Sequence, residues 1–140
     1  MQLTRESEHA IRGLGFLATL PRDRHIPLSE IALARDLPPS FLAKTFQKLA
    51  RHGLVESARG RGKGYALAKP AGEINVLDIV VAVEGSILLT RCLLWAARCH
   101  DHDPCPLHHL LKDRVRLLEA SLREITLSDV AESGLDSGGE

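Results

Sequence analysis

Apolar side chains recur every three or four residues in three consecutive segments near the start of the chain, the spacing of helices with one buried face. The first segment covers 8–20, the second 27–36, and the third runs from residue 41 to about 52, where Gly53 follows as a C-terminal cap. Ser40 precedes the third segment and is predicted to be its N-cap. Two short helices joined by a tight turn predict a helix-turn-helix.

A β-hairpin is predicted directly after these helices. The stretches "LVESA" and "YALA" have the composition of short strands, and residues 59–64, "RGRGKG", lie between them with three glycines and three cations. Glycine allows tight turns, and cations suit phosphates or a minor groove, so the loop is predicted to be the wing of a winged helix. A generic hairpin is the alternative. Nucleotide-binding glycine loops open a helix, which this loop does not.

The remaining residues predict three more helices. Residues 75–85 form a buried helix that Asn75 caps and Gly85 ends, a long helix begins near Pro106, and a short helix covers 125–134. Along the long helix the apolar residues alternate in steps of four and three, the pattern of a coiled-coil seam. These predicted dimerisation residues are Leu111, Val115, Leu118, Leu122 and Ile125. Such a seam predicts a partner helix from a second subunit, although it could also pack on its own domain.

The predicted fold class is mainly α with a small β-wing: a winged helix-turn-helix domain followed by a long C-terminal dimerisation helix. We expect a DNA-binding domain at 1–70, a cluster-binding loop and dimerisation helix at 71–132, and a disordered tail at 133–140.

Charge distinguishes the two halves of the chain, although the net charge is zero. Residues 1–70 hold twelve Lys/Arg and six Asp/Glu, whereas 71–140 hold six and twelve. A basic half predicts an anionic partner, most often a nucleic acid such as double-stranded DNA, with a solvated basic face as the alternative. The sequence has no apolar run of membrane-spanning length and no signal-peptide pattern, so we expect a cytoplasmic protein without membrane contacts.

The third helix is predicted to bury one face and to present the other to DNA. Its buried face comprises Phe41, Leu42, Thr45, Phe46 and Leu49. On the exposed face Ser40 and Gln47 can read base edges, and Lys44 and Lys48 can reach phosphates. From the wing, the cations that we expect to reach the adjacent groove or backbone are Arg59, Arg61 and Lys63.

All three cysteines lie in one short stretch, residues 92–109, together with four of the seven histidines. Cys92, Cys99, Cys105 and His108 give the spacing C-x6-C-x5-C-x2-H. In a reducing compartment, clustered thiols favour metal or redox chemistry over a disulfide framework. Zinc knuckles prefer closer cysteine pairs, so this wider spacing suits an iron–sulfur cluster. A zinc ion and thiol redox chemistry without a metal stay open as alternatives.

Three stretches together resemble the Rrf2 family of winged-helix regulators: the opening "MQLTRESEHAIRGLGFLA", the wing with the helix that follows it, and the cysteine loop. The resemblance extends from Met1 to about Glu132, and its most specific parts are "M-x-L-T", "RGxGxGYxL" and the three cysteines. Members include regulators of iron–sulfur cluster biogenesis and nitric-oxide-sensitive repressors. The family implies a homodimer that binds a palindromic promoter site, carries one cluster per subunit and changes its DNA affinity with cluster state.

The resemblance implies two different fourth ligands. His108 stands two residues beyond Cys105, as in members with a two-iron cluster held by three cysteines and one histidine. Glu8 occupies the place of an acidic residue that, in the nitric-oxide-sensitive type, completes a four-iron cluster from the first helix of the partner subunit. Cluster-binding members often space the first two cysteines by five residues rather than six, so this loop must bulge. His108 could instead only solvate the helix start, and Glu8 could be a surface residue.

No Ser/His/Asp set or carboxylate pair emerges from the motifs, so the sequence does not predict an enzyme.

Two function classes remain. The first is a transcription factor whose iron–sulfur cluster senses redox state, iron–sulfur status or nitric oxide. The second is a metal or electron-transfer module whose winged helix serves protein contacts. The cations of the third helix and the wing favour the first.

Overall fold

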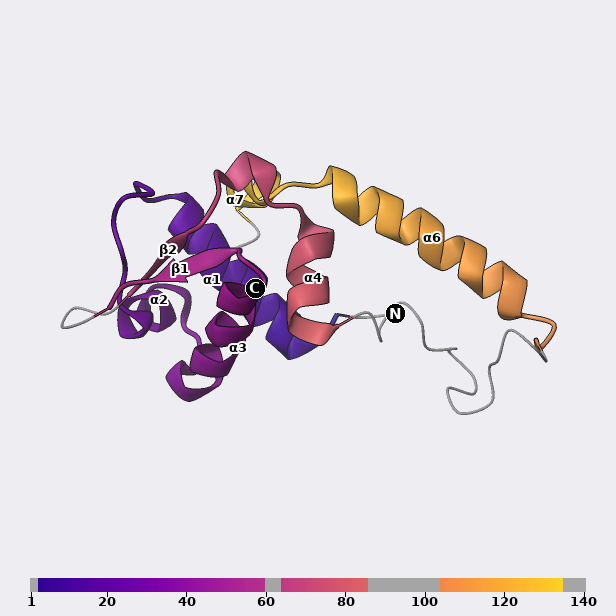
Figure 1. Cartoon of the computed structure of the whole chain (residues 1–140), viewed down its shortest axis with the longest axis horizontal. Helices are drawn as coiled ribbons and strands as arrows, with labels where there is room; N and C mark the ends of the chain where they lie inside the picture. Colours follow the sequence, from indigo (N-terminus) through magenta and orange to yellow (C-terminus); the bar gives the residue numbers. More distant parts are fainter. Residues whose placement is uncertain (1–2, 60–63, 86–103, 135–140) are drawn as a thin grey trace.

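The computed structural model describes residues 3–59, 64–85 and 104–134. In chain order the elements are α1 (Arg5–Ala18), α2 (Leu28–Arg35), α3 (Pro39–Arg51), β1 (Val55–Ser57), β2 (Tyr65–Leu67), the 3-10 turn η1 (Ala71–Glu73), α4 (Val76–Glu84), α6 (His108–Glu124) and α7 (Leu127–Ser133). The first three helices and the hairpin form a winged helix, and α6 extends away from it as an arm (Figure 1). The predicted fold class, mainly helical with a small β-wing, is confirmed.

Helix α1 begins before the predicted residue 8 because Thr4 caps it. The backbone of Thr4 is extended, and its hydroxyl oxygen accepts a hydrogen bond from the backbone N–H of Ser7 at 3.2 Å. Further along, Gly13 faces α3, where a Cβ would lie 2.9 Å from Cε2 of Phe46. The missing side chain therefore sets how closely α1 and α3 approach.

The turn between α2 and α3 differs in detail from the prediction. Asp36 ends α2 in the left-handed conformation, with φ 51°. Helix α3 then begins at Pro39, so the expectation that Ser40 is its N-cap was wrong; the cap is Pro38, which makes no side-chain hydrogen bond. Proline suits the first helical turn because it lacks a backbone N–H, which at this position would have no partner within the helix. At the other end Gly53 follows α3 with φ 70°, as its predicted capping role requires.

The two strands of the wing are antiparallel, with Ser57 opposite Tyr65, and are slightly shorter than predicted. Tyr65 also pairs with the segment before α2: each N–H of Tyr65 and Ile26 donates to the other's carbonyl oxygen at 2.9 Å. Gly64 precedes this bridge, and a Cβ there would lie 2.5 Å from the backbone carbon of Ile26. The base of the wing is thus fixed to the helix-turn-helix by a contact that only glycine permits.

The core of the winged helix also includes residues from beyond Pro70. Ile74 and Leu127 are completely buried in the same cluster as Leu14 and Phe46. Helices α4 and α7 both pack on α1. The predicted boundary at residue 70 therefore divides two sequence regions that share one core.

Helices α4 and α7 have the caps that their sequences indicate. The Asn75 side chain accepts a hydrogen bond from the N–H of Asp78 at 2.8 Å, and α4 ends at Gly85, as predicted. Before α7, Thr126 and Asp129 form a reciprocal capping box, so this helix begins later than the predicted residue 125. The hydrogen bonds from Thr126 lower the pKa of the exposed Asp129 carboxyl. Residues 135–140 of the predicted tail lie outside the described residues.

Helix α6 contains no buried residue along its whole length. At its end near the domain, Leu122 packs against the cluster of Val76, Val80 and Val130. Within the described ranges, no helix is both long and apolar enough to cross a membrane.

Candidate nucleic-acid interface and metal centre

Helix α3, which corresponds to the recognition helix of a helix-turn-helix, has one buried and one exposed face. Leu42, Thr45, Phe46 and Leu49 are buried, as predicted. Ser40, Lys44 and Gln47 are exposed and follow one another at helical spacing, so they form one stripe on the opposite side. This stripe has the donors and acceptors needed to contact a DNA major groove.

Phe41 is not part of the core, contrary to the prediction. It is 44% exposed, and its ring meets the edge of His9 on α1 at a centroid distance of 5.7 Å. Phe41 lies at the edge of the apolar stripe of α3, where the ring contacts His9 of α1 but stays partly open to solvent. The first turn of the recognition helix therefore presents an apolar surface beside Ser40.

The side chain of Lys48 is 39% exposed, but its ammonium group lies against protein atoms. Its Nζ atom lies 2.7 Å from Oε1 of Glu6 and 3.2 Å from the carbonyl oxygen of Val83. Glu6 also accepts a hydrogen bond from the hydroxyl of Thr45 at 3.3 Å. The predicted phosphate contact by Lys48 stays a prediction, but its ammonium group already has two protein partners.

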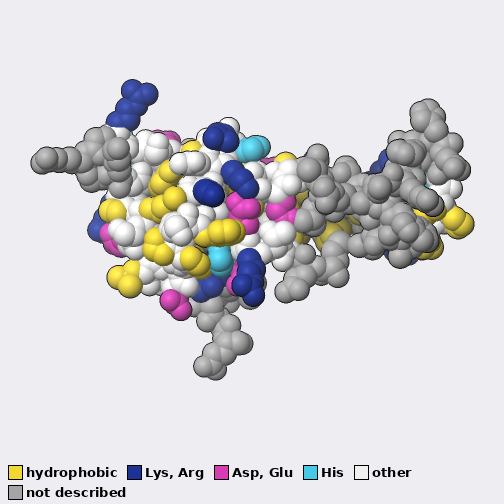
Figure 2. All heavy atoms as spheres, turned by 90° about the horizontal axis from the view of Figure 1, so that it is seen from below, with side chains coloured by type: hydrophobic (Ala, Val, Ile, Leu, Met, Phe, Trp, Pro, Cys, Tyr) yellow, Lys and Arg dark blue, Asp and Glu magenta, His cyan; other side chains and the backbone are white. Residues whose placement is uncertain are grey.

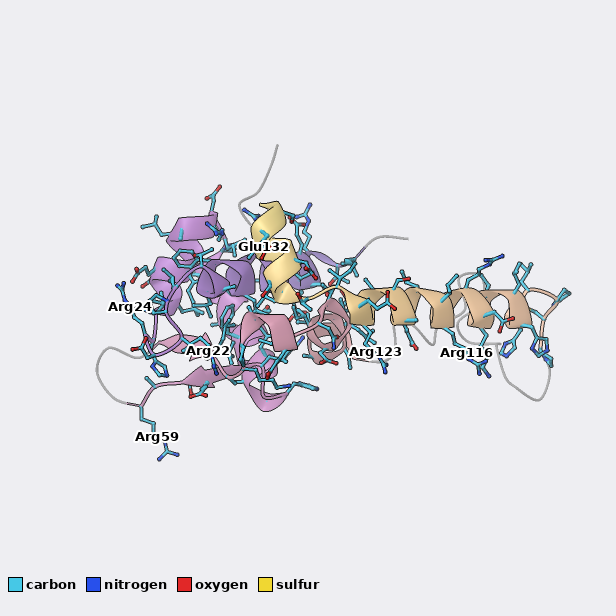
Figure 3. All side chains as sticks on the ribbon, turned by 90° about the horizontal axis from the view of Figure 1, so that it is seen from above. Arg22, Arg24, Arg59, Arg116, Arg123 and Glu132 are labelled. Atoms are coloured by element: carbon cyan, nitrogen blue, oxygen red, sulfur yellow. The ribbon has the colours of Figure 1, made fainter. Side chains whose placement is uncertain are left out.

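The wing contributes one described cation to the same region. Arg59 follows β1, is exposed and extends away from the body of the domain (Figure 3). Arg61 and Lys63 lie outside the described residues. At the base of the hairpin, the N–H of Ala58 donates to the carbonyl oxygen of Gly64 at 2.9 Å, which holds the two ends of the loop together.

The face of the domain seen from below Figure 1 carries Lys and Arg side chains among fewer acidic ones (Figure 2). Exposed apolar side chains lie between them on this face. Such a mixed surface supports groove contacts in addition to phosphate attraction.

The described part of the cysteine motif lies at the start of the arm. Cys105 is half-buried, and its carbonyl oxygen accepts a hydrogen bond from the N–H of His108 at 2.9 Å, so the two residues share one turn. The rings of His108 and His109 meet edge to face at 5.3 Å. Cys92 and Cys99 lie outside the described residues. In the described ranges, no three Cys, His, Asp or Glu residues come together as a metal site.

Glu8, the other candidate ligand, belongs to a different part of the chain. It lies on α1, is exposed and pairs with Arg12 one turn later at 3.8 Å. The first turn of α6 lies at the far end of the arm, well separated from α1 (Figure 1). A single chain therefore does not bring Glu8 to Cys105, and a shared site would need the Glu8 of a second subunit.

The predicted seam on α6 is half-buried in the single chain. Leu111, Val115, Leu118 and Leu122 have this intermediate exposure, whereas Ile125 is 42% exposed and follows the last helical residue. Ile125 was predicted to be the last residue of the seam, but it lies just beyond the end of α6. Beside the seam, Leu110 and Leu117 are 51% and 60% exposed, so the apolar surface is wider than the predicted stripe.

The structure also shows a polar site that sequence reasoning missed. The carboxylate of Glu84, at the end of α4, accepts hydrogen bonds from the N–H of Thr4 at 3.1 Å, from its hydroxyl at 2.5 Å and from the hydroxyl of Ser7. Because these contacts span more than seventy positions, no local pattern could indicate them. The only signal was the capping sequence at the start of α1.

Comparison with known families and relatives gives consistent matches. The family model Rrf2, described as an iron-dependent transcriptional regulator, matches residues 3–133. A Neisseria meningitidis protein assigned to the HTH-type transcriptional regulators is 36% identical over 132 residues, covering 94% of this chain and 88% of the relative. The HTH-type transcriptional regulator IscR of Klebsiella pneumoniae is 34% identical over 130 residues, covering 93% of this chain and 79% of the relative.

Solved structures show the same fold. T. potens IscR superposes with a TM-score of 0.75 at 24% identity, covering all of this chain and 93% of the other. The oxidized form of CymR from Staphylococcus aureus superposes with a TM-score of 0.71 at 27% identity, covering 94% of this chain and 97% of the other. The shared architecture thus includes the arm as well as the winged helix.

Proposed function

This chain belongs to the Rrf2 family of DNA-binding transcriptional regulators, and on that premise we propose that an iron–sulfur cluster controls its affinity for a promoter site. The family is one of regulators and not of enzymes. The observation that carries the proposal is the position of the cysteine motif in the sequence. The motif connects α4, which packs on the winged helix, with α6, which has no fully buried residue.

The DNA-binding surface comprises the exposed stripe of α3, with Ser40, Lys44 and Gln47, and the wing cations Arg59, Arg61 and Lys63. The exposure of the stripe and the fixed base of the wing support this proposal. Replacing both Arg61 and Lys63 by Ala should lower the salt dependence of DNA binding by about one unit of slope per lost phosphate contact. An unchanged slope would remove the wing from the interface.

The protein acts as a homodimer through α6 and binds a palindromic site. The half-buried seam and the exposed Leu110 and Leu117 support a second copy as the partner, because large apolar side chains are rarely left this exposed along a whole helix. Two recognition helices related by twofold symmetry match two half-sites about one DNA turn apart.

Cys92, Cys99 and Cys105 hold the cluster, and His108 or the Glu8 of a second subunit completes it. The donor set fits: Cys105 is a half-buried thiol, and His108 lies on the same turn at the start of α6. When bound, the cluster supplies a group that oxidants or nitric oxide can alter. Ligands on both sides of the loop would fix the end of α4 relative to α6, and their release would change the spacing of the two recognition helices.

A zinc-binding or thiol-redox regulator without a cluster is the second candidate. It is favoured by the similarity to Staphylococcus aureus CymR, of which an oxidized form has been solved. Cysteine thiols alone can respond to oxidants, so the same motif and fold serve this function as well.

The metal content of protein purified without oxygen distinguishes the two candidates. We expect iron and sulfide together with a visible chromophore, and Ser at any of the three cysteine positions should abolish that chromophore. Glu8→Ala and His108→Ala are compared in parallel, because the substitution that alters the spectrum identifies the fourth ligand. One zinc ion per chain without sulfide would overturn the cluster and leave the second candidate.

A further inference from the structure

Polar contacts join the recognition helix to the end of α4, where the chain enters residues 86–103. Lys48 of α3 donates to the carbonyl oxygen of Val83 at 3.2 Å and to the carboxylate of Glu6 at 2.7 Å. The last carbonyl groups of a helix have no partner within the helix, and its C-terminal end favours a positive charge. Lys48 therefore connects the negative end of α4 with the first turn of α1.

Glu84, the next residue, fixes the same end of α4 to α1. Its Oε1 atom accepts hydrogen bonds from the N–H and hydroxyl of Thr4, the N-cap of α1, and from the hydroxyl of the fully buried Ser7. A carboxylate at a helix N-terminus is also favoured by the helix dipole. The other oxygen, Oε2, is buried without a hydrogen-bond partner among the described residues. We call the contacts of Glu84 and Lys48 the α4 clasp.

The clasp brings the start of α1, the second half of α3 and the end of α4 to one point. Gly85 follows Glu84 with φ 72° and turns the chain out of the helix. Cys92 and Cys99 lie in the segment that comes next. A displacement of the chain after Gly85 would act first on the end of α4. There the clasp adds polar contacts to the apolar core that Val83 shares with Phe46 of the recognition helix.

We propose that Lys48 and Glu84 are positioning residues that couple the segment after α4 to the placement of α3, and that Lys48 does not contact DNA phosphates. The coupling rests on the proposed function, in which this segment holds cluster ligands and α3 reads DNA. Lys44, one turn earlier on the same helix, is exposed and is the phosphate contact.

The first experiment separates a phosphate contact from a positioning role. Binding of Lys48→Met and Lys44→Met to random-sequence duplex DNA is measured over a range of salt concentrations. Losing one phosphate contact makes the negative slope of log K against log salt shallower by about 0.9. We expect that loss for Lys44→Met and an unchanged slope for Lys48→Met. A loss of about 0.9 for Lys48→Met would overturn the inference.

The second experiment measures coupling between the two helices. Hydrogen exchange is followed in Glu84→Ala, with Glu73→Ala of the exposed turn η1 as the control. We expect faster exchange of α3 amides in Glu84→Ala, although none of the hydrogen bonds found for Glu84 involves α3, and no change in the control. Unchanged α3 exchange in Glu84→Ala would contradict the clasp.

The third experiment uses a DNA site selected by the wild-type protein. The ratio of affinities with and without the cluster should survive in Lys44→Met and fall toward 1 in Lys48→Met. A retained ratio in Lys48→Met would refute the coupling. If the wild-type ratio is itself 1, cluster control has failed, while the salt slopes and hydrogen exchange still decide the roles of Lys48 and Glu84.

Discussion

Helices α3 and α6 have similar amphipathic patterns, but of the two only α3 has fully buried residues within the described chain. Its residues Leu42, Phe46 and Leu49 are completely buried, whereas α6 has no buried residue in any of its turns. The difference arises from neighbours: α3 packs against α1, α2, α4 and β1, and α6 has close contacts mainly with α4. An apolar stripe thus predicts that a helix face will be covered, but not which chain covers it.

The largest expected effect tests α3, the helix whose apolar face is covered by its own chain. Phe46 is fully buried and meets Tyr65 edge to face at 5.1 Å. Phe46→Ala should lower the free energy of unfolding by about 3–5 kcal/mol in urea denaturation at fixed protein concentration. Phe41→Ala on the same helix should lower it by less than about 1 kcal/mol, because that ring is 44% exposed. Equal losses would mean that the two rings are buried alike.

A charge in the seam of α6 tests whether the apolar face of this helix is covered by a second subunit. Leu118→Asp places an unpaired carboxylate at the middle of the proposed interface and should weaken the dimer by about 3 kcal/mol, roughly a hundredfold in dissociation constant. Light scattering at micromolar concentration measures the change. Arg116→Asp, on an exposed position of the same helix (Figure 3), is the control and should leave the dimer intact. A clean Leu118→Asp dimer would show that the seam faces its own subunit.

The base of the wing should respond less strongly than either. Gly64→Ala forces a Cβ to within 2.5 Å of the Ile26 backbone, which should cost about 1–3 kcal/mol and lower the melting temperature by several degrees. At Gly72, the nearest atom to an added Cβ is Oγ of Ser128 at 3.7 Å, an ordinary contact. Gly72→Ala should therefore leave the melting temperature unchanged. The same melting temperature for both variants would contradict the close approach at Gly64.

The smallest effect concerns the junction between arm and domain. The capping box lowers the pKa of Asp129 below its ordinary value of 3.8 in the folded protein. A depressed carboxyl pKa gives stability that is present above the unfolded pKa and is lost as pH falls through the folded pKa. Between about pH 5 and pH 2, wild type should lose slightly more unfolding free energy than Asp129→Asn. Parallel pH curves would show that the capping box contributes no pH-dependent stability.

Local patterns predicted most of the helices and caps correctly. Asn75 and Gly85 bound α4 as expected, since capping depends on residues only a few positions apart. Ser40 was misplaced because a proline can begin a helix without a side-chain cap. Phe41 fits the helical period of a buried face, yet it is 44% exposed.

Long-range contacts could not be predicted from sequence. Lys48 has the charge and the helical position of a DNA-facing residue, but its partners, Glu6 and Val83, are distant from it in the sequence. Glu84 gave no signal at all, because its partners are at the start of α1. The roles of Cys92 and Cys99 depend on residues outside the described ranges and stay predictions.

The most direct test of cluster control is the affinity for one selected promoter duplex, measured in a single anaerobic preparation before and after the iron is removed by a chelator. We expect the affinity to change by about 5- to 150-fold, the usual range of coupling between two sites, and to recover when iron and sulfide are restored. An affinity that stays the same while the chromophore disappears would contradict the account.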